Sequence, residues 1–213
     1  MSERYPIPAA QARAEIEVKR SRFIATAVPA FTVEEAKAFI ARIKKEFGDA
    51  THNVPAFIIG HGAAVTAHCN DDGEPSGTAG RPILAILQGS GLGDTALVVT
   101  RYYGGTKLGA GGLVRAYGDA AKAVLDVLPR AQKVSAHTVL LAIPYNYLER
   151  IRLLVEKWRG RILEEDFAAD ITITAQFPTA QFPAFQNDLR ELSHGALAAE
   201  IVETGNVILP RDA

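Results

Sequence analysis

The stretch VVTRYYGGTKLGAGGLVRAY, residues 98–117, decides how this chain is interpreted. It begins in an apolar segment, residues 95–100, that is typical of a buried strand. Five glycines follow between Gly104 and Gly112, and the pattern then predicts a helix to about Leu128. A strand, a glycine-rich loop and a helix N-terminus in this order can bind an anion, because backbone N–H groups and the helix dipole favour a phosphate.

Basic and aromatic side chains around this loop are candidate ligand contacts. Lysine and arginine there could neutralise phosphates, and a second basic cluster occupies residues 19–22. Tyr102 and Tyr103 are adjacent in a strand, so we expect one ring in the core and the other outward beside Arg101, where it could stack on a base. The predicted anion or nucleic-acid site comprises Arg22, Arg101, Tyr102, Tyr103, Gly104, Gly105, Lys107 and Arg115.

A purely structural loop is the alternative, in which the glycines let the backbone pass close to a neighbouring element and the tyrosines only pack. The loop lacks the Gly-Lys-Ser/Thr of a phosphate-binding Walker loop. It also lacks the third glycine of a dinucleotide fingerprint, because Val114 stands at that position. Both interpretations therefore stay open at this point.

Three carboxylates gather in the block DDGEPSGTAGRP, residues 71–82. Asp71, Asp72 and Glu74 are weak candidates for a hard cation such as Mg²⁺, although their spacing is not that of an EF-hand loop. The alternative is a tight turn in which Asp and Ser oxygens accept from backbone N–H groups and Ser76 or Thr78 caps the following helix. No cofactor is expected.

Signals for catalysis are weak. Cys69 has no evident orienting partner, and the histidines at 52, 61 and 68 do not have zinc-ligand spacing. The nucleophile elbow Gly-x-Ser-x-Gly and the motif His-Glu-x-x-His are both missing. The sequence favours a protein that is not an enzyme.

Hydrophobic periodicity predicts two α+β halves. In the first half, strands are expected at 14–18, 23–28, 54–59, 64–69 and 95–100, with helices from 32 to 47 and around Pro82. Thr32 and Glu35 have the spacing of a capping box. In the second half, strands at 134–143, 161–165, 169–176 and 200–202 alternate with helices at 147–158 and 180–192. This β-α-β-β-α-β order is the split-βαβ, ferredoxin-like arrangement. The predicted domains are 1–130 and 131–213.

Composition places the chain among globular cytoplasmic proteins. Hydrophobic residues make up 48% and charged residues 22%, no apolar run is long enough to cross a membrane, and one cysteine cannot form an internal disulfide. Residues 1–130 contain 15 basic and 13 acidic residues, and the remainder contains 8 and 11. Any contact with nucleic acid must therefore be a local patch rather than a generally basic surface.

Long motifs in the first half resemble the signature of the IMPACT/YigZ family. They are Ser21-Arg22-Phe23, the block from Asp71 to Gly80, and the loop from Arg101 to Gly105 with the helix start from Gly112 to Tyr117. The resemblance implies an N-terminal domain with the ribosomal protein S5 domain 2-like fold, similar to domain IV of elongation factor G. It also implies a ferredoxin-like C-terminal domain similar to domain V of that factor.

The resemblance also implies a link to translation regulation. Eukaryotic IMPACT proteins regulate translation during starvation by competing for a scaffold, an activity tied to an additional RWD domain that this sequence is not expected to contain. The expected function is a non-catalytic binding protein whose partner is RNA, the ribosome or a translation factor. The alternatives are a protein-interaction scaffold without nucleic-acid contact, or a metal-dependent enzyme acting on a small phosphorylated ligand. The oligomeric state is left open.

Overall fold

The computed structural model describes residues 4–62 and 64–210. The chain forms two compact units, made mainly of Tyr5–Gln132 and Lys133–Leu209. The change between them falls inside the strand β7 (Arg130–Ile143), which begins in the first unit and continues into the second. The protein is thus an α+β chain of two domains, as the sequence predicts.

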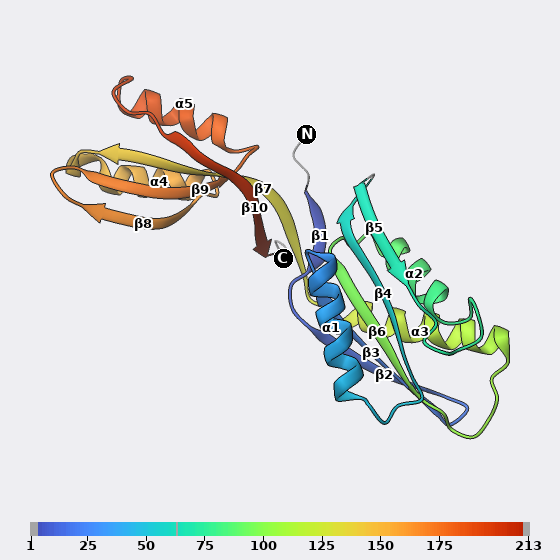
Figure 1. Cartoon of the computed structure of the whole chain (residues 1–213). Helices are drawn as coiled ribbons and strands as arrows, with labels where there is room; N and C mark the ends of the chain where they lie inside the picture. Colours follow the sequence, from blue (N-terminus) through green and yellow to red (C-terminus); the bar gives the residue numbers. More distant parts are fainter. Residues whose placement is uncertain (1–3, 63, 211–213) are drawn as a thin grey trace. The chain divides into compact units, whose positions relative to one another are not determined.

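The first unit is built on a five-stranded antiparallel sheet in the order β2-β3-β6-β4-β5. Its strands are β2 (Ala12–Val18), β3 (Ser21–Pro29), β6 (Thr95–Tyr102), β4 (His52–His61) and β5 (Ala64–Cys69). The helix α1 (Val33–Glu46) lies on one face, and the helices α2 (Gly80–Gly89) and α3 (Ala110–Val127) lie on the other (Figure 1). A sheet covered on both faces explains why β6 is a continuous apolar run.

Each face of this sheet has its own hydrophobic core, and β6 contributes to both by strand alternation. Leu97 and Val99 join the core under α2 and α3, whereas Ala96 and Val98 join the core under α1. Arg101 continues the first series, so its side chain enters the site from the α2 and α3 face.

The capping box at the start of α1 is confirmed. Thr32 Oγ1 accepts a hydrogen bond from the Glu35 amide at 3.1 Å, and the Glu35 carboxylate accepts one from the Phe31 amide at 2.7 Å. Two acidic residues in the first turn and two lysines in the last turn complement the helix dipole. The helix therefore forms where local sequence predicts it.

A short N-terminal strand is a feature that the sequence did not predict. The strand β1 (Tyr5–Pro8) pairs with β7, and Tyr5 and Ile7 share a small buried cluster with Ala131. Two prolines in four residues mask any alternation, and the strand is stabilised by distant groups such as the Asp94 carboxylate, which accepts from the Tyr5 hydroxyl at 2.8 Å. Only the tertiary structure reveals it.

The second unit has the predicted ferredoxin-like order. Its sheet places β9 (Ile171–Pro178) between β7 and β8 (Arg161–Phe167), and β10 (Glu200–Pro210) pairs with the other edge of β7. A 3₁₀ turn (Tyr145–Tyr147) leads into α4 (Leu148–Lys157), which packs with α5 (Phe182–Leu192) against one face. The last strand is longer than the expected residues 200–202. The sequence did not predict the extension, because most of it is exposed and carries no hydrophobic alternation.

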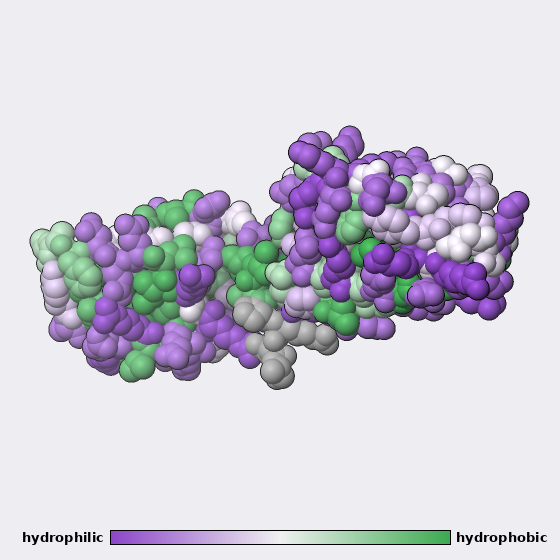
Figure 2. Space-filling view, turned by 90° about the horizontal axis from the view of Figure 1, so that it is seen from below, coloured by the Kyte–Doolittle hydropathy of each residue, from purple (hydrophilic) through white to green (hydrophobic). Residues whose placement is uncertain are grey.

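No helix within residues 4–62 and 64–210 is long and apolar enough to span a membrane. In Figure 2 hydrophilic residues predominate, with apolar side chains in separate areas between them. The exposed large hydrophobic residues are distributed over several elements.

Candidate functional site

The site begins at the N-terminus of α3, where the glycine-rich loop ends. Gly109 is the N-cap residue, with φ of 75°, a conformation that favours glycine, and it has no side chain to cap the helix. The first intrahelical bond runs from the Leu113 amide to the Gly109 carbonyl. Within the described residues, the amides of Ala110, Gly111 and Gly112 therefore have no hydrogen-bond acceptor, and no acidic side chain lies in the first turn. Such a helix start suits an anionic ligand.

A buried ion pair forms the wall opposite this helix start. The Arg101 guanidinium is 5% exposed and donates from Nη1 to Glu74 Oε1, which also accepts from the Tyr117 hydroxyl at 2.8 Å. The rings of Phe23 and Tyr103 lie 5.4 and 5.5 Å from the guanidinium carbon. Burial, followed by the charge and hydrogen bond of Glu74, raises the pKa of Tyr117 far above its ordinary range, so its hydroxyl stays a donor. The ion pair and the Tyr117 hydroxyl are therefore largely shielded from solvent.

His52 extends the same wall. Its Nδ1 lies 2.8 Å from the Asp72 carbonyl oxygen, and its Nε2 lies 3.7 Å from Glu74 Oε1. A carbonyl oxygen can only accept, so Nδ1 donates to Asp72, and Nε2 faces the Glu74 carboxylate. His52 could not be predicted as part of the site, because its position opposite Arg101 depends on the pairing of β4 with β6.

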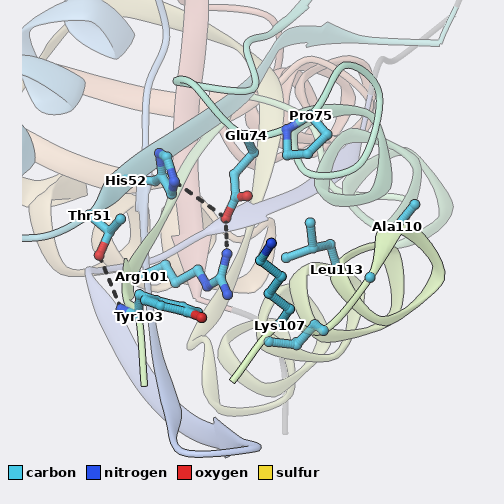
Figure 3. A pocket seen from close by; sticks show the side chains of 11 residues that line it. Thr51, His52, Glu74, Pro75, Arg101, Tyr103, Lys107, Ala110 and Leu113 are labelled. Atoms are coloured by element: carbon cyan, nitrogen blue, oxygen red, sulfur yellow. Dashed lines mark hydrogen bonds and ion pairs between the residues drawn. The ribbon is translucent and has the colours of Figure 1, made fainter. Parts of the chain in front are cut away.

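These groups enclose a cavity of about 400 Å³ (Figure 3). One side is polar, with Thr51, His52, Glu74 and Arg101. The other side is mainly apolar, with Pro75, Leu108, Ala110 and Leu113. Tyr103, Lys107 and Gly109 complete the lining, and Figure 3 shows the Lys107 amine turned toward the centre. The volume lies in the range of roughly 300–1,000 Å³ typical of small-molecule sites.

The candidate metal ligands do not converge. Asp71 accepts from the amides of Gly77, Ala79 and Gly80, and Asp72 pairs with Lys44 and accepts from the Asn53 amide. Glu74 belongs to the Arg101 pair. Within the described part of the chain, no three His, Cys, Asp or Glu side chains are grouped as metal ligands.

The expected turn, in which an Asp side chain accepts from backbone amides, is confirmed at Asp71, but the expected helix cap was wrong in its residue. Asp71, rather than Ser76 or Thr78, accepts from the first amides of α2, while the Thr78 hydroxyl donates to the Pro75 carbonyl at 2.6 Å. The block folds back on itself, so the acceptor comes from nine residues before the helix. A local capping pattern could not show this.

Asp71→Asn is expected to lower stability at neutral pH by about 1 kcal/mol, the usual contribution of a capping carboxylate. Burial raises the pKa of the Asp71 carboxyl, but the hydrogen bonds from Gly77, Gly80 and Ala79 outweigh it, so the net pKa lies below its ordinary value. Its contribution is therefore present above the unfolded pKa and lost as pH falls through the lower folded pKa. Urea unfolding across acid pH should show a shallower loss for the variant than for the wild type. Equal slopes for both proteins would contradict this role.

The structure divides the predicted binding residues between the two faces of the sheet. Arg101 and Tyr103 lie on the α2 and α3 face with Lys107. Arg22 and Tyr102 lie on the α1 face, where Arg22 pairs with Glu15 and the Tyr102 hydroxyl donates to Asp49.

The expectation that one of the two tyrosines enters the core was wrong. Tyr103 is 46% exposed and Tyr102 is half-buried, because β6 ends here beyond the cover of the helices. Gly104 and Gly105 continue the loop, and Arg115 is exposed on α3 outside the cavity lining.

The fold and the site together define a two-domain α+β protein whose first domain has a ligand-sized cavity beside a glycine-rich helix start. The comparisons with known proteins agree with this class. The "Impact N-terminal domain" family matches residues 19–125, and the "Domain of unknown function (DUF1949)" family matches residues 141–196. The chain therefore belongs to the IMPACT family.

Relatives of similar length support the assignment. An IMPACT family member from Haemophilus influenzae is 39% identical, over 94% of this chain and 98% of its own length. The IMPACT family member YigZ from Escherichia coli is 38% identical, over 94% and 99%. A solved structure described as a hypothetical protein matches with a TM-score of 0.64 and 38% identity, over 94% of this chain and 98% of its own.

Proposed function

We propose that this protein is a non-catalytic, cytoplasmic binding protein linked to translation, and that it contacts RNA, alone or within the ribosome or a factor complex. The observation that carries the proposal is the start of α3. Three amides there have no acceptor among the described residues, and the segment that contains them also contributes Lys107 to the cavity lining. Amides and a lysine bind phosphate oxygens without reading sequence.

The charges around this start support a local phosphate contact. Lys107 and Arg115 are exposed and form no ion pair within the described residues. Arg101, by contrast, is buried against Glu74, so it stabilises the cavity wall and does not reach a phosphate at the surface. Arg22 is held by Glu15 on the opposite face of the sheet.

Lys107→Ala and Arg115→Ala are each expected to weaken tRNA binding and to reduce the slope of log K against log salt by about one unit, because each removes about one phosphate contact. The double variant should show about twice the reduction. Filter binding across a salt series measures both quantities.

Lys122→Ala is the matched control, because Lys122 is exposed on the same helix but far from its N-terminus. It should leave the slope unchanged. Equal slopes for the wild type, the double variant and the control would contradict the proposed function.

A further inference from the structure

The cavity beside α3 has chemically different ends. One end is the helix start, where Ala110 lines the cavity and its amide is followed by the amides of Gly111 and Gly112. The Lys107 amine points toward the centre, and all these groups are donors. The opposite end is formed by the Glu74 carboxylate, which can only accept, with His52 beside it. A ligand that fills both ends needs an anionic group at one end and hydrogen-bond donors at the other.

The Glu74 carboxylate at the acceptor end can accept a further hydrogen bond. Glu74 Oε1 accepts from Arg101 and Tyr117, whereas Oε2 makes no hydrogen bond to any described residue. Among the described side chains, Arg101 Nε is the polar atom that is fully buried and has no partner. Glu74 Oε2 also has no partner but is not in that class, so it is not fully buried. In Figure 3 the interactions of Glu74 converge on one oxygen, and the other is left beside the cavity. A carboxylate from a side chain only 8% exposed thus presents an open acceptor to the cavity.

The walls between the two ends suit a flat ring. Pro75, Leu108 and Leu113 give an apolar side, and a volume of about 400 Å³ holds a ligand of small-molecule size rather than a duplex. An aliphatic amino acid has both an anion and donors but offers no flat ring for the apolar side. Proteins that recognise RNA specifically take up unpaired bases against such surfaces and read their edges.

We infer that this cavity binds one nucleotide unit, with its phosphate at the start of α3 and an amine-bearing base directed at Glu74 and His52. This inference deepens the proposed function, because it names the part of an RNA that the site takes up: a terminal or extruded nucleotide. Adenine, cytosine and guanine each offer an exocyclic amine to Glu74 Oε2. Uracil offers no amine, and the two carbonyl oxygens that flank its N3–H would come close to the Glu74 carboxylate.

The experiment titrates the full-length protein with AMP, CMP, GMP and UMP up to ~10 mM and follows backbone amide shifts by NMR, since weak fragments of a larger ligand bind in the millimolar range. We expect the three amine-bearing nucleotides to shift the amides of residues 107–113 and of Glu74. UMP and the nucleosides without phosphate should bind at least about tenfold more weakly, because each leaves one end of the cavity without its partner.

Ala110→Phe fills the cavity without removing any charge, and it should abolish these shifts. Val114→Phe is its control on the same helix, since Val114 is 43% exposed and outside the cavity lining, and it should bind like the wild type. Mononucleotides that shift no cavity residue, while tRNA binding stays salt-sensitive, would overturn this inference and leave the proposed function in place. UMP binding as tightly as AMP would overturn the role of Glu74. Mononucleotide binding without any tRNA binding would support the cavity and reject the RNA contact.

Discussion

Glu74→Ala is expected to destabilise the first domain by about 3–5 kcal/mol, the usual cost of removing one partner from a buried ion pair. The variant would leave the Arg101 guanidinium without its counterion, although that side chain is only 5% exposed. The Tyr117 hydroxyl would also lose its acceptor inside the core. Urea unfolding followed by far-UV circular dichroism measures the loss. Trp158, the one tryptophan in the sequence, lies in the second domain and reports separately on that domain by fluorescence.

Two controls separate the ion pair from a general effect of charge. Glu165→Ala breaks the pair with Arg152 in the second domain, whose side chains are 18% and 39% exposed, and solvent screening should limit its cost to about 1 kcal/mol. Glu74→Leu combined with Arg101→Met removes both charges, so the double variant should lose less stability than the two single variants added together. An unfolding curve for Glu74→Ala that matches the wild type would show that this pair does not support the cavity wall.

The features that the sequence predicts correctly depend on local patterns. The alternation of Ile171, Ile173 and Ala175 with exposed residues places β9 in the second core, and the capping box places the start of α1. The β-α-β-β-α-β order then follows from the succession of elements. The strand β1 has no such pattern, since its partners Asp94 and Ala131 are distant in sequence.

The site is only partly predictable for the same reason. Strand alternation puts Arg101 in the buried series of Leu97 and Val99. Because a buried charge is costly without a counterion, this position indicates that the guanidinium needs an acidic partner. The identity of that partner, Glu74, depends on how residues 71–80 fold back against the sheet. The anion-binding helix start was recognisable from its glycines, whereas the acceptor end of the cavity was not, because His52 and Glu74 meet only through the tertiary structure.

Alanine substitutions at three glycines of this region should differ in their effect on stability, because one glycine lacks space for a side chain and another has an unfavourable backbone conformation. The β2–β3 turn consists of Lys19 and Arg20, both with positive φ, 48° and 68°, which is the two-residue type I′ geometry. This turn brings the Arg20 carbonyl against Gly104. The Gly104 amide donates to Ser21 Oγ at 3.1 Å, and Ser21 in turn contacts Arg101. The loop and the buried ion pair are thereby joined through Ser21.

Gly104→Ala is expected to cost about 3 kcal/mol, at the upper end of what overpacking costs, because the obstacle is rigid backbone. A Cβ there would overlap the Arg20 carbonyl and lie 2.5 Å from Ser21 N, closer than real Cβ atoms come to any neighbour. Gly105→Ala meets no atom within 4 Å but has φ of 84°, so it should cost about 1–2 kcal/mol through conformation alone. Gly111→Ala has neither obstacle and should stabilise α3 by up to about 1 kcal/mol. Urea unfolding of the three variants tests this order. If the Gly104→Ala protein is no less stable than Gly105→Ala, the β2–β3 turn can move away from the loop. Ser21 then does not hold Arg101 in place.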